Sequence, residues 1–421
     1  MKAARIMMLA LLALTASVTG AFGSIVTSAG GRAEFQRLRW KGRAIRIEIS
    51  SSLTRQNTNI KYGSDVTGAI QRSIQAWQAV ADIEMLVGPS DKMSVSPSGL
   101  TGDGVSLITI AQTPENVLFF SKDSDTASAK TRIFFGRSGN ITEADIVLNP
   151  FQQFSTDGTF GTFDLESTLT HEIGHLLGLR HSGVMGATMA ESFARMGTFG
   201  LVDLSQRTLG ESDIAAIRDL YGPARETSGC CAEINGKLTV PTTKTARTLR
   251  VWAEEDRTGR VIAQSDANAD GTFSIGGIPA GTYSLFWKTA DESSSSIGQL
   301  GSVKLEAGET KTLTEKIALR TVNLSTQYIG LNNQIADFGV PLTGGRSFVV
   351  YLGGKNLDPR TAAVEFNSPY FSVSPNSIAS EDFDGSVSVI SFTVSVNSST
   401  PPGEYSIFLT GEDGLRSCLI L

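Results

Sequence analysis

The spacing of hydrophobic residues changes character once along the chain. From about residue 38 to residue 223, segments with alternating apolar residues are interspersed with segments whose apolar residues recur every three or four positions. Alternation is typical of half-buried strands, and the wider spacing is typical of amphipathic helices. After Cys231 the helical spacing disappears, and short β-rich runs separated by Gly, Ser and Thr continue to the end. The sequence therefore predicts an α+β unit followed by all-β units.

The strands of the α+β unit are predicted from short apolar or alternating runs. In the clearest run, AIRIEIS at 44–50, the three isoleucines fall on one face of the strand. The other predicted strands are VSLITI at 105–110, VLFF at 117–120, TRIFF at 131–135 and ADIVLN at 144–149.

Two segments of the same unit have the apolar spacing of helices. The first runs from Asp65 to Ala81. The second runs from about Leu209 to Tyr221, and Thr208 with Glu211 has the spacing of a capping box at its start. Gly222 and Pro223 follow it and are typical helix terminators, so the unit is expected to close there.

Two β-sandwich modules are expected after the α+β unit, at 232–320 and 321–421. The first contains DGTFSIGGIPAGTYSLFW at 270–287, with Asp270 and Gly271 expected to form a turn between strands. This segment resembles the carboxypeptidase-regulatory-like, transthyretin-type sandwich. Runs such as SVISFTVSV at 388–396 resemble an immunoglobulin-like sandwich.

Composition and charge narrow the class of protein. The chain has 421 residues, of which 40% are hydrophobic and 19% charged, which is typical of globular material in more than one domain. With a net charge of -6 and no long basic run, we expect no nucleic-acid partner.

The N-terminus has the pattern of a secretory signal peptide. Lys2 and Arg5 precede an apolar stretch at 6–14, and small residues follow up to Gly23. We therefore expect residues 1–23 to be a signal peptide, followed by an α+β domain at 24–225. No second hydrophobic span follows, so we expect a secreted, extracellular protein with no membrane span in the mature chain.

The chemistry is concentrated in HEIGHLLGLRHSGVMGATM at 171–189. His171 and His175 are four residues apart, so on a helix both imidazoles project from one face and can reach one metal ion. Asp164 is the expected N-cap of that helix. Gly178 permits the positive φ with which a chain commonly leaves a helix, and this brings His181 back as a third ligand.

Three neutral imidazoles leave one position of a tetrahedral zinc ion open, as in catalytic sites. Glu172 is then placed to act as general base toward a zinc-activated water. All three histidines of the chain lie in this window. A rival arrangement, with Glu191 or Glu211 as the third ligand, leaves Gly178 and His181 without a role.

The motif HExxHxxGxxH, followed by Ser182 and by Met189 eight residues after His181, resembles the metzincin zinc peptidases, in particular the matrixin branch. The resemblance implies a twisted, mainly parallel sheet above an active-site helix, with Met189 in a Met-turn beneath the metal. It also implies a secreted zinc endopeptidase that hydrolyses protein or peptide substrates. The second, structural zinc of animal matrixins requires further histidines, so only one zinc ion is expected.

Two points remain open. DANADG at 266–271 has Asp266, Asn268 and Asp270 at calcium-loop spacing, but Gly277 occupies the twelfth position, so we interpret the segment as a hairpin turn, with bound Ca2+ as the alternative. One of Cys230 and Cys231 could pair with Cys418, which the sequence does not decide.

The alternative function is a secreted adhesion or matrix-binding protein whose peptidase domain is a scaffold. The complete ligand set and Glu172 favour the enzyme. The β-rich modules are expected to be separable from the chemistry, and binding of a surface or polymeric substrate by these modules is a hypothesis.

Overall fold

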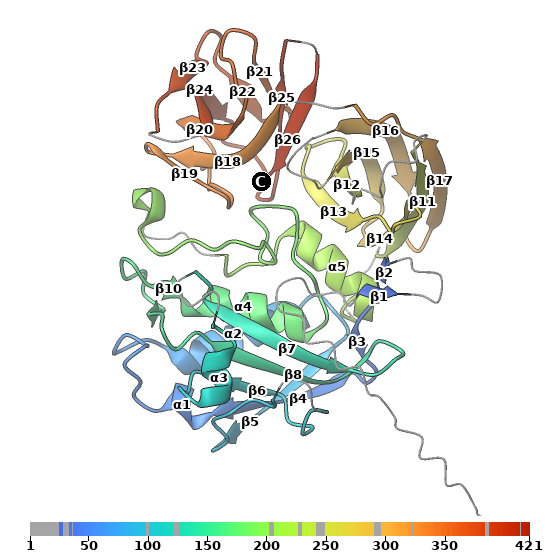
Figure 1. Cartoon of the computed structure of the whole chain (residues 1–421). Coiled ribbons are helices and arrows are strands. Elements are labelled where there is room, and N and C mark those ends of the chain that lie inside the picture. Colours follow the sequence, from blue (N-terminus) through green and yellow to red (C-terminus); the bar gives the residue numbers. More distant parts are fainter. Residues whose placement is uncertain are drawn as a thin grey trace, which may run out of the picture.

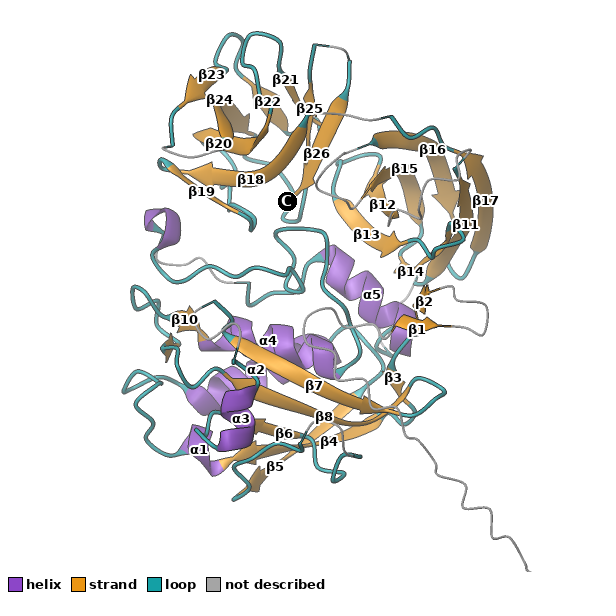
Figure 2. Ribbon diagram, in the orientation of Figure 1, coloured by secondary structure: helices purple, strands orange, loops and turns teal. Residues whose placement is uncertain are grey.

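The protein is described here by a computed structural model. It describes residues 25–27, 33–35, 37–97, 101–121, 126–201, 206–225, 230–240, 249–289, 296–320, 324–383, 387–412 and 414–421. The predicted signal peptide at 1–23 lies outside these residues. Three parts follow one another along the chain (Figure 1): an N-terminal unit up to Arg225, a first β-rich unit at 230–320 and a second β-rich unit at 324–421. All described helices lie in the N-terminal unit (Figure 2).

The N-terminal unit is built on one mixed sheet. Its strands lie in the order β3-β8-β6-β4-β5, with β7 paired to β8. All the pairings are parallel except that of β7 with β8, so the sheet is mainly parallel, as expected. The strands are β3 Arg39–Trp40, β4 Ala44–Ser50, β5 Glu84–Ser90, β6 Leu107–Thr109, β7 Ala129–Phe135 and β8 Asn140–Leu148. The predicted strands at 44–50, 105–110, 131–135 and 144–149 are thereby confirmed.

The predicted strand VLFF at 117–120 is wrong. Residues Pro114–Leu118 form the short helix α3, in which the Thr113 side chain accepts a hydrogen bond from the N–H of Asn116 and Pro114 stands at the first helical position. A cap followed by proline favours a helical start over a strand. Phe120 is buried against the sheet in a small apolar cluster, so the apolar run reflects burial.

Two longer helices pack together beside the sheet. Helix α2 spans Val66–Gln78, and the Asp65 carboxylate caps it by accepting from the N–H of Gly68. Helix α4 spans Leu165–Leu176 and packs against α2. Trp77 of α2 is completely buried at this contact, and its indole N–H donates to the carbonyl of Thr170 at 2.9 Å. No helix within the described ranges is long and apolar enough to cross a membrane.

Helix α5, Glu211–Tyr221, begins later than predicted. Its N-cap is Gly210, whose backbone N–H donates to the Asp213 carboxylate at 3.0 Å. The expected cap at Thr208 is therefore wrong, because Asp213 rather than Glu211 reaches back to the helix start. The remaining short elements of this unit are β1 Ile25–Thr27, β2 Ala33–Phe35, α1 Ser51–Thr54, β9 Phe154–Ser155, β10 Phe163–Asp164 and the 3-10 turn η1 Thr198–Gly200.

The first β-rich unit consists of two sheets that share one hydrophobic core. The sheets have the orders β14-β11-β17 and β13-β12-β15-β16. This arrangement is consistent with the expected β-sandwich. Its strands are β11 Ala232–Thr239, β12 Leu249–Glu255, β13 Val261–Asp266, β14 Thr272–Ile278, β15 Gly281–Thr289, β16 Ile297–Leu305 and β17 Thr310–Lys316.

The segment DANADG forms a tight turn, but the predicted hairpin is wrong. The N–H of Gly271 donates to the carbonyl of Asn268 at 2.8 Å, yet the flanking strands β13 and β14 belong to different sheets. The turn therefore links the two layers. The Asp266 carboxylate pairs with Arg250 at 2.8 Å and that of Asp270 accepts from Thr272, so these acids have other partners and calcium gains no support here.

The second β-rich unit also consists of two sheets over a common core. The orders are β19-β18-β20-β24-β22, with β23 paired to β24, and β21-β25-β26. Its strands are β18 Ser325–Leu331, β19 Gln334–Ala336, β20 Ser347–Lys355, β21 Ala363–Phe366, β22 Phe371–Val373, β23 Ala379–Glu381, β24 Ser388–Val396, β25 Ser406–Thr410 and β26 Arg416–Ile420. This unit too is consistent with a β-sandwich.

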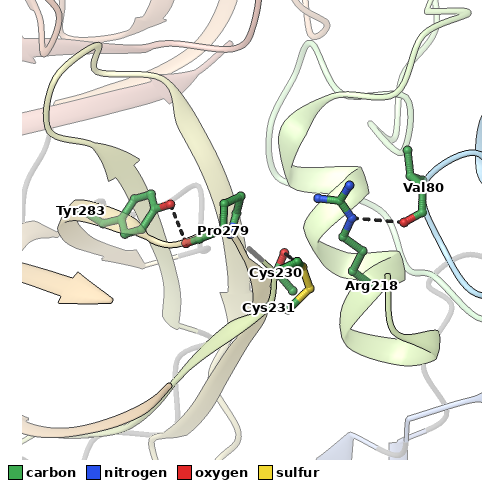
Figure 3. The surroundings of a disulfide bond; sticks show 7 residues. Val80, Arg218, Cys230, Cys231, Pro279 and Tyr283 are labelled. Carbon is green, nitrogen blue, oxygen red and sulfur yellow. Dashed lines mark hydrogen bonds between the residues drawn. A yellow bond between two sulfur atoms is a disulfide. The ribbon is translucent and has the colours of Figure 1, made fainter. Parts of the chain in front are cut away.

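Two of the three cysteines form a disulfide with each other. A disulfide joins Cys230 to Cys231 in the stretch between α5 and β11 (Figure 3). Cys418 is a free, buried thiol on β26, and burial raises its pKa to about 12. Of the pairings that the sequence left open, the structure therefore has Cys230 with Cys231 and none with Cys418.

The β-rich units are not separate from the N-terminal unit. Val184 and Ala187, in the loop after His181, are completely buried in a cluster to which both β-rich units contribute. The other buried members are Trp252, Val261 and Phe286 from the first β-rich unit and Phe408, Cys418 and Ile420 from the second. The C-terminal end beyond β26 lies next to this loop (Figure 1). The expectation of separable modules is therefore at odds with the packing.

We predict that a chain ending at Arg225 is less stable than the full chain, because Val184 and Ala187 lose their apolar cover. Exposed apolar surface of this kind favours dye binding and association. Thermal unfolding and binding of a hydrophobic dye measure the effect. An unchanged midpoint with no added dye binding would contradict the prediction.

Candidate metal centre

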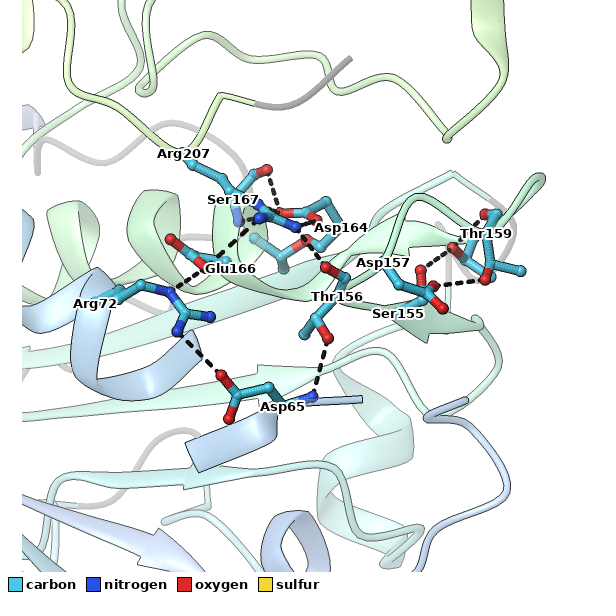
Figure 4. Close-up of polar contacts among 12 residues, drawn as sticks. Asp65, Arg72, Ser155, Thr156, Asp157, Thr159, Asp164, Glu166, Ser167 and Arg207 are labelled. Carbon is cyan, nitrogen blue, oxygen red and sulfur yellow. Dashed lines mark hydrogen bonds and ion pairs between the residues drawn. The ribbon is translucent and has the colours of Figure 1, made fainter. Parts of the chain in front are cut away.

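The helix that carries the first two histidines starts at a polar network. The Asp164 carboxylate caps α4, accepting from the N–H of Ser167 at 2.8 Å, as predicted. Arg207 donates to both Asp164 oxygens, at 3.0 and 2.5 Å, and to the carbonyl of Thr156 (Figure 4). Because Arg207 follows the loop that returns from the metal centre, these bonds tie that loop to the start of α4.

The same network joins the starts of α2 and α4. Arg72 of α2 donates to Glu166 at 2.8 Å and to Asp65 at 3.0 Å (Figure 4). The backbone N–H of Asp65 in turn donates to the Thr156 hydroxyl at 2.9 Å. Charge-assisted bonds of this kind fix the start of α4 relative to its neighbours.

The three histidines converge as the motif predicts. His171 and His175 lie one turn apart on α4, and their ring centroids are 4.5 Å apart. The ring centroid of His181 lies 5.3 Å from that of His171 and 4.8 Å from that of His175. One ligand atom from each of the three lies within 4.8 Å of the others, so together they can hold one metal ion.

The hydrogen bonds of the rings suit metal binding. The Nδ1 atom of His171 lies 2.8 Å from the carbonyl of Thr188, and that of His175 lies 2.9 Å from the carbonyl of Leu179. A carbonyl oxygen only accepts, so each Nδ1 carries the proton and each Nε2 keeps its lone pair. Such bonds orient the rings and select the tautomer that a zinc ion requires.

Gly178 turns the chain out of α4 toward His181. Its φ is +98°, and an ideal Cβ there would lie 2.2 Å from the carbonyl oxygen of Leu38. Both the positive φ and the close approach require glycine. The role predicted for Gly178 therefore has a steric basis.

The segment that returns from His181 places Met189 beneath the helix. The N–H of Ser182 donates to the carbonyl of Met189 at 2.6 Å, which closes the loop. An ideal Cβ on Gly174 would lie 2.3 Å from the Met189 sulfur, so this side chain packs against the backbone between His171 and His175. Met189 thus lies against α4 between the two helical histidines, where the sequence predicted a Met-turn.

Asp213 of α5 holds the turn that carries Met189, and the sequence reasoning missed it. Its carboxylate accepts from the N–H groups of Thr188 at 2.8 Å and Met189 at 3.2 Å. Burial raises its pKa to about 6, against the backbone hydrogen bonds, which lower it. The signal in the sequence that could have identified Asp213 is an acidic residue on the otherwise apolar, buried face of the helix that follows the metal motif.

Glu172 is buried next to the ligands. Its Oε2 atom accepts a hydrogen bond from the hydroxyl of Thr131 on β7. Burial raises its pKa to about 7, and the bond from Thr131 opposes this rise. A carboxylate with a pKa near neutrality both accepts and donates a proton readily. Thr131 was not singled out from the sequence, because its role depends on the neighbouring strand.

The rival third ligands do not join the histidines. Within the described residues, the group of converging metal ligands contains His171, His175 and His181 and no carboxylate. Glu211 is instead bonded to Arg260 at 3.0 Å. His181 is the third member of the site.

Comparison with known proteins is consistent with this geometry. A sequence model of the matrixin family, peptidase family M10, matches residues 119–222. The match includes the three histidines, Glu172 and Met189 and excludes both β-rich units, so this stretch is matrixin-like. Matrixins are zinc peptidases. No match was found among curated proteins.

Solved structures match only loosely. The major pilin subunit BcpA of Bacillus cereus is 10% identical over 45% of this chain and 68% of its own, with a TM-score of 0.18. The SGBP-B protein from the mixed-linkage glucan utilization locus of Bacteroides ovatus is 14% identical over 45% of this chain and 40% of its own, with a TM-score of 0.17. Likeness at these TM-scores supports no argument about fold or function.

We predict that Gly178→Ala destabilises the protein and weakens zinc binding, because the new Cβ meets the Leu38 carbonyl. Gly63→Ala is the matched control, since Gly63 also has a positive φ, +85°, but nothing within 4 Å of its Cβ position. The control costs about 1–2 kcal/mol of backbone strain, and Gly178→Ala costs at least ~1 kcal/mol more. Equal losses in thermal unfolding would contradict the steric explanation.

We predict that acid releases zinc only well below pH 6.5. Burial, with a contribution from His181, lowers the pKa of His171 from 6.5 to about 3, and burial also lowers the pKa of His175 and His181. The imidazoles therefore stay neutral in mild acid, where protons would otherwise displace the metal. Zinc release measured against pH should have its midpoint at least about one unit below 6.5. A midpoint at or above 6.5 would contradict the prediction.

Proposed function

We propose that this protein is a zinc-dependent endopeptidase whose metal is held by His171, His175 and His181 and whose general base is Glu172. The observation that supports this most directly is that one ligand atom from each of the three imidazoles lies within 4.8 Å of the others. The Nδ1 atoms of His171 and His175 are bonded to backbone carbonyls, which leaves their Nε2 atoms for the metal. Three ligands leave an open position, which is typical of catalytic rather than structural zinc. The matrixin match over residues 119–222 favours the same reaction class.

The mechanism divides the work between the ligands and Glu172. A zinc ion, when bound, supplies a Lewis acid that polarises the scissile carbonyl and acidifies the attacking water. Glu172 accepts the proton of that water and returns it to the nitrogen of the leaving amine. Glu172 is buried beside the three histidines, and the Thr131 hydroxyl donates a hydrogen bond to its carboxylate and orients it.

Strand β7 is the proposed support for the substrate backbone. It pairs with β8 on one side, and no other described strand pairs with it. Thr131 on β7 contacts Glu172, so β7 runs beside the site. An extended peptide can add to such an edge through main-chain hydrogen bonds, which favours cleavage within a chain and little dependence on substrate termini.

The wider organisation is part of the same proposal. Residues 1–23 are a signal peptide, residues 24–225 a matrixin-like peptidase domain, and 232–320 and 321–421 two sandwich modules. The protein acts outside the cell on protein or peptide substrates. One catalytic zinc ion is its cofactor.

We predict that Glu172→Gln keeps zinc but lowers peptide hydrolysis by about 10²–10⁴-fold, because the amide accepts from Thr131 but cannot take a proton from water. Zinc content and cleavage of a casein-derived peptide measure the two properties. Glu191→Gln tests the rival ligand and is expected to keep zinc and most activity, since Glu191 is outside the ligand group and interacts with His181 through its charge.

Near-normal turnover by Glu172→Gln would overturn the role of Glu172. Loss of zinc from Glu191→Gln would instead revive a carboxylate as the third ligand. A full chain that binds zinc but cleaves no peptide would favour the scaffold alternative.

A further inference from the structure

The segment Ser182–Leu201, which follows the third histidine, is held by both β-rich units. On the first unit, Gln264 of β13 accepts from the N–H of Gly183 at 3.2 Å and donates to the Ser182 hydroxyl at 3.0 Å. These bonds lie directly after His181. The first β-rich unit thus contacts the chain one residue beyond the last proposed ligand.

The second β-rich unit holds the near end of the segment through its C-terminal strand. The N–H of Met185 donates to the carbonyl of Ile420 at 2.7 Å, and the carbonyl of Met185 accepts from the N–H of Gly339 at 3.0 Å. Val184 and Ala187 on either side are completely buried. The loop that carries Met189 is therefore packed between two sandwiches and does not project freely.

The far end of the segment enters the core of the second unit. Phe199 is completely buried there, with its ring centroid 5.5 Å from that of Phe338. Its N–H donates to Gln334 and its carbonyl accepts from Asn332, both at 2.7 Å. Phe199 has a φ of +57°, which is unfavourable for a phenylalanine and persists where the surroundings enforce it. Phe199 is thus an anchor.

Between these two ends the segment touches the metal centre. The ring of Phe193 lies edge-on to that of His171, with centroids 4.5 Å apart. The neighbouring Ser192 hydroxyl donates to the Asp337 carboxylate of the second unit at 2.7 Å. The second unit is therefore bonded one residue away from a side chain that contacts a proposed ligand.

A cavity borders this segment. It has a volume of about 760 Å³ and lies between α4 and the second unit. Its walls include Thr168 and Phe193 on one side and Phe338 and Leu342 on the other. The N-terminal unit does bond the segment at Met196, whose N–H donates to the carbonyl of Thr162 at 2.9 Å. Phe193 packs against the core of the N-terminal unit on one side and borders the cavity on another.

We propose that the second β-rich unit is a positioning element of the metal centre. By anchoring Ser182–Leu201 at Met185 and at Phe199, it keeps His181 and Met189 in place and keeps Phe193 against His171. This inference deepens the proposed zinc site and rests on it. It assigns the second unit a task in the chemistry, in place of an independent binding module.

The test compares two full-length variants that remove the same side chain from the same core. Phe199→Ala removes the anchor, and Phe392→Ala truncates a completely buried phenylalanine on β24. Zinc affinity is measured by chelator competition. The kinetic constants kcat and KM are measured with a peptide substrate, and exposure of the segment is measured by trypsin cleavage after Arg195. All are measured at a temperature at which both variants are folded.

Phe199→Ala is expected to lower zinc affinity at least tenfold, to raise KM and to speed cleavage after Arg195. Phe392→Ala is expected to keep zinc affinity and KM within about twofold of the unsubstituted chain, even if its unfolding temperature falls equally. Equal zinc affinities for the two variants would overturn the positioning role.

A second pair of variants avoids the core. Asp337 is exposed, and Asp337→Ala removes the acceptor of Ser192, whereas Asp337→Asn retains one. We expect about a threefold rise in KM for Asp337→Ala and recovery in Asp337→Asn. Equal KM values for Asp337→Ala and Asp337→Asn would contradict a role for the Ser192–Asp337 hydrogen bond.

Failure of the proposed function can be told from failure of this inference. Zinc binding without hydrolysis in the unsubstituted chain overturns the endopeptidase, but the zinc affinities still decide the positioning role. Absence of zinc binding overturns both. Hydrolysis with equal zinc affinities and equal KM in Phe199→Ala and Phe392→Ala overturns the inference alone.

Discussion

The metal centre depends on how one residue, Thr188, joins helix α4 to the turn beneath it. The Thr188 carbonyl accepts the proton of His171 Nδ1, and its N–H donates to the buried carboxylate of Asp213. The first bond selects the tautomer that leaves His171 Nε2 available for a metal. The second ties the turn to α5. The ligand geometry on α4 is thus coupled to a helix that closes the N-terminal unit.

That coupling extends beyond the N-terminal unit. The turn around Thr188 follows a loop whose tip is buried between the two β-rich units, and Phe199 further on is buried in the second. The burial of Val184 and Ala187 favours one position of the loop, because exposing them costs apolar surface. The loop after His181 is thus held by both β-rich units as well as by the N-terminal unit.

Local chemistry could be predicted from the sequence, and long-range contacts could not. The spacing of His171 and His175 and the conformational freedom of Gly178 are local properties, so the convergence of the three histidines was predictable. The predicted strand at 117–120 was wrong because an apolar run indicates burial but does not determine the backbone conformation. Asp213, Thr131 and Phe199 escaped notice because each acts on residues that are far away in the sequence. The packing of the loop after His181 between the β-rich units escaped notice for the same reason.

The central claim is that three imidazoles, and no carboxylate or sulfur, hold one zinc ion. X-ray absorption at the zinc edge of the metal-loaded full chain tests it most directly. The expected result is three imidazole nitrogens at about 2.0–2.1 Å and one further light atom, with outer-shell scattering typical of imidazole rings. A shell containing sulfur, a site with only two imidazoles, or a site saturated by four protein ligands would contradict it.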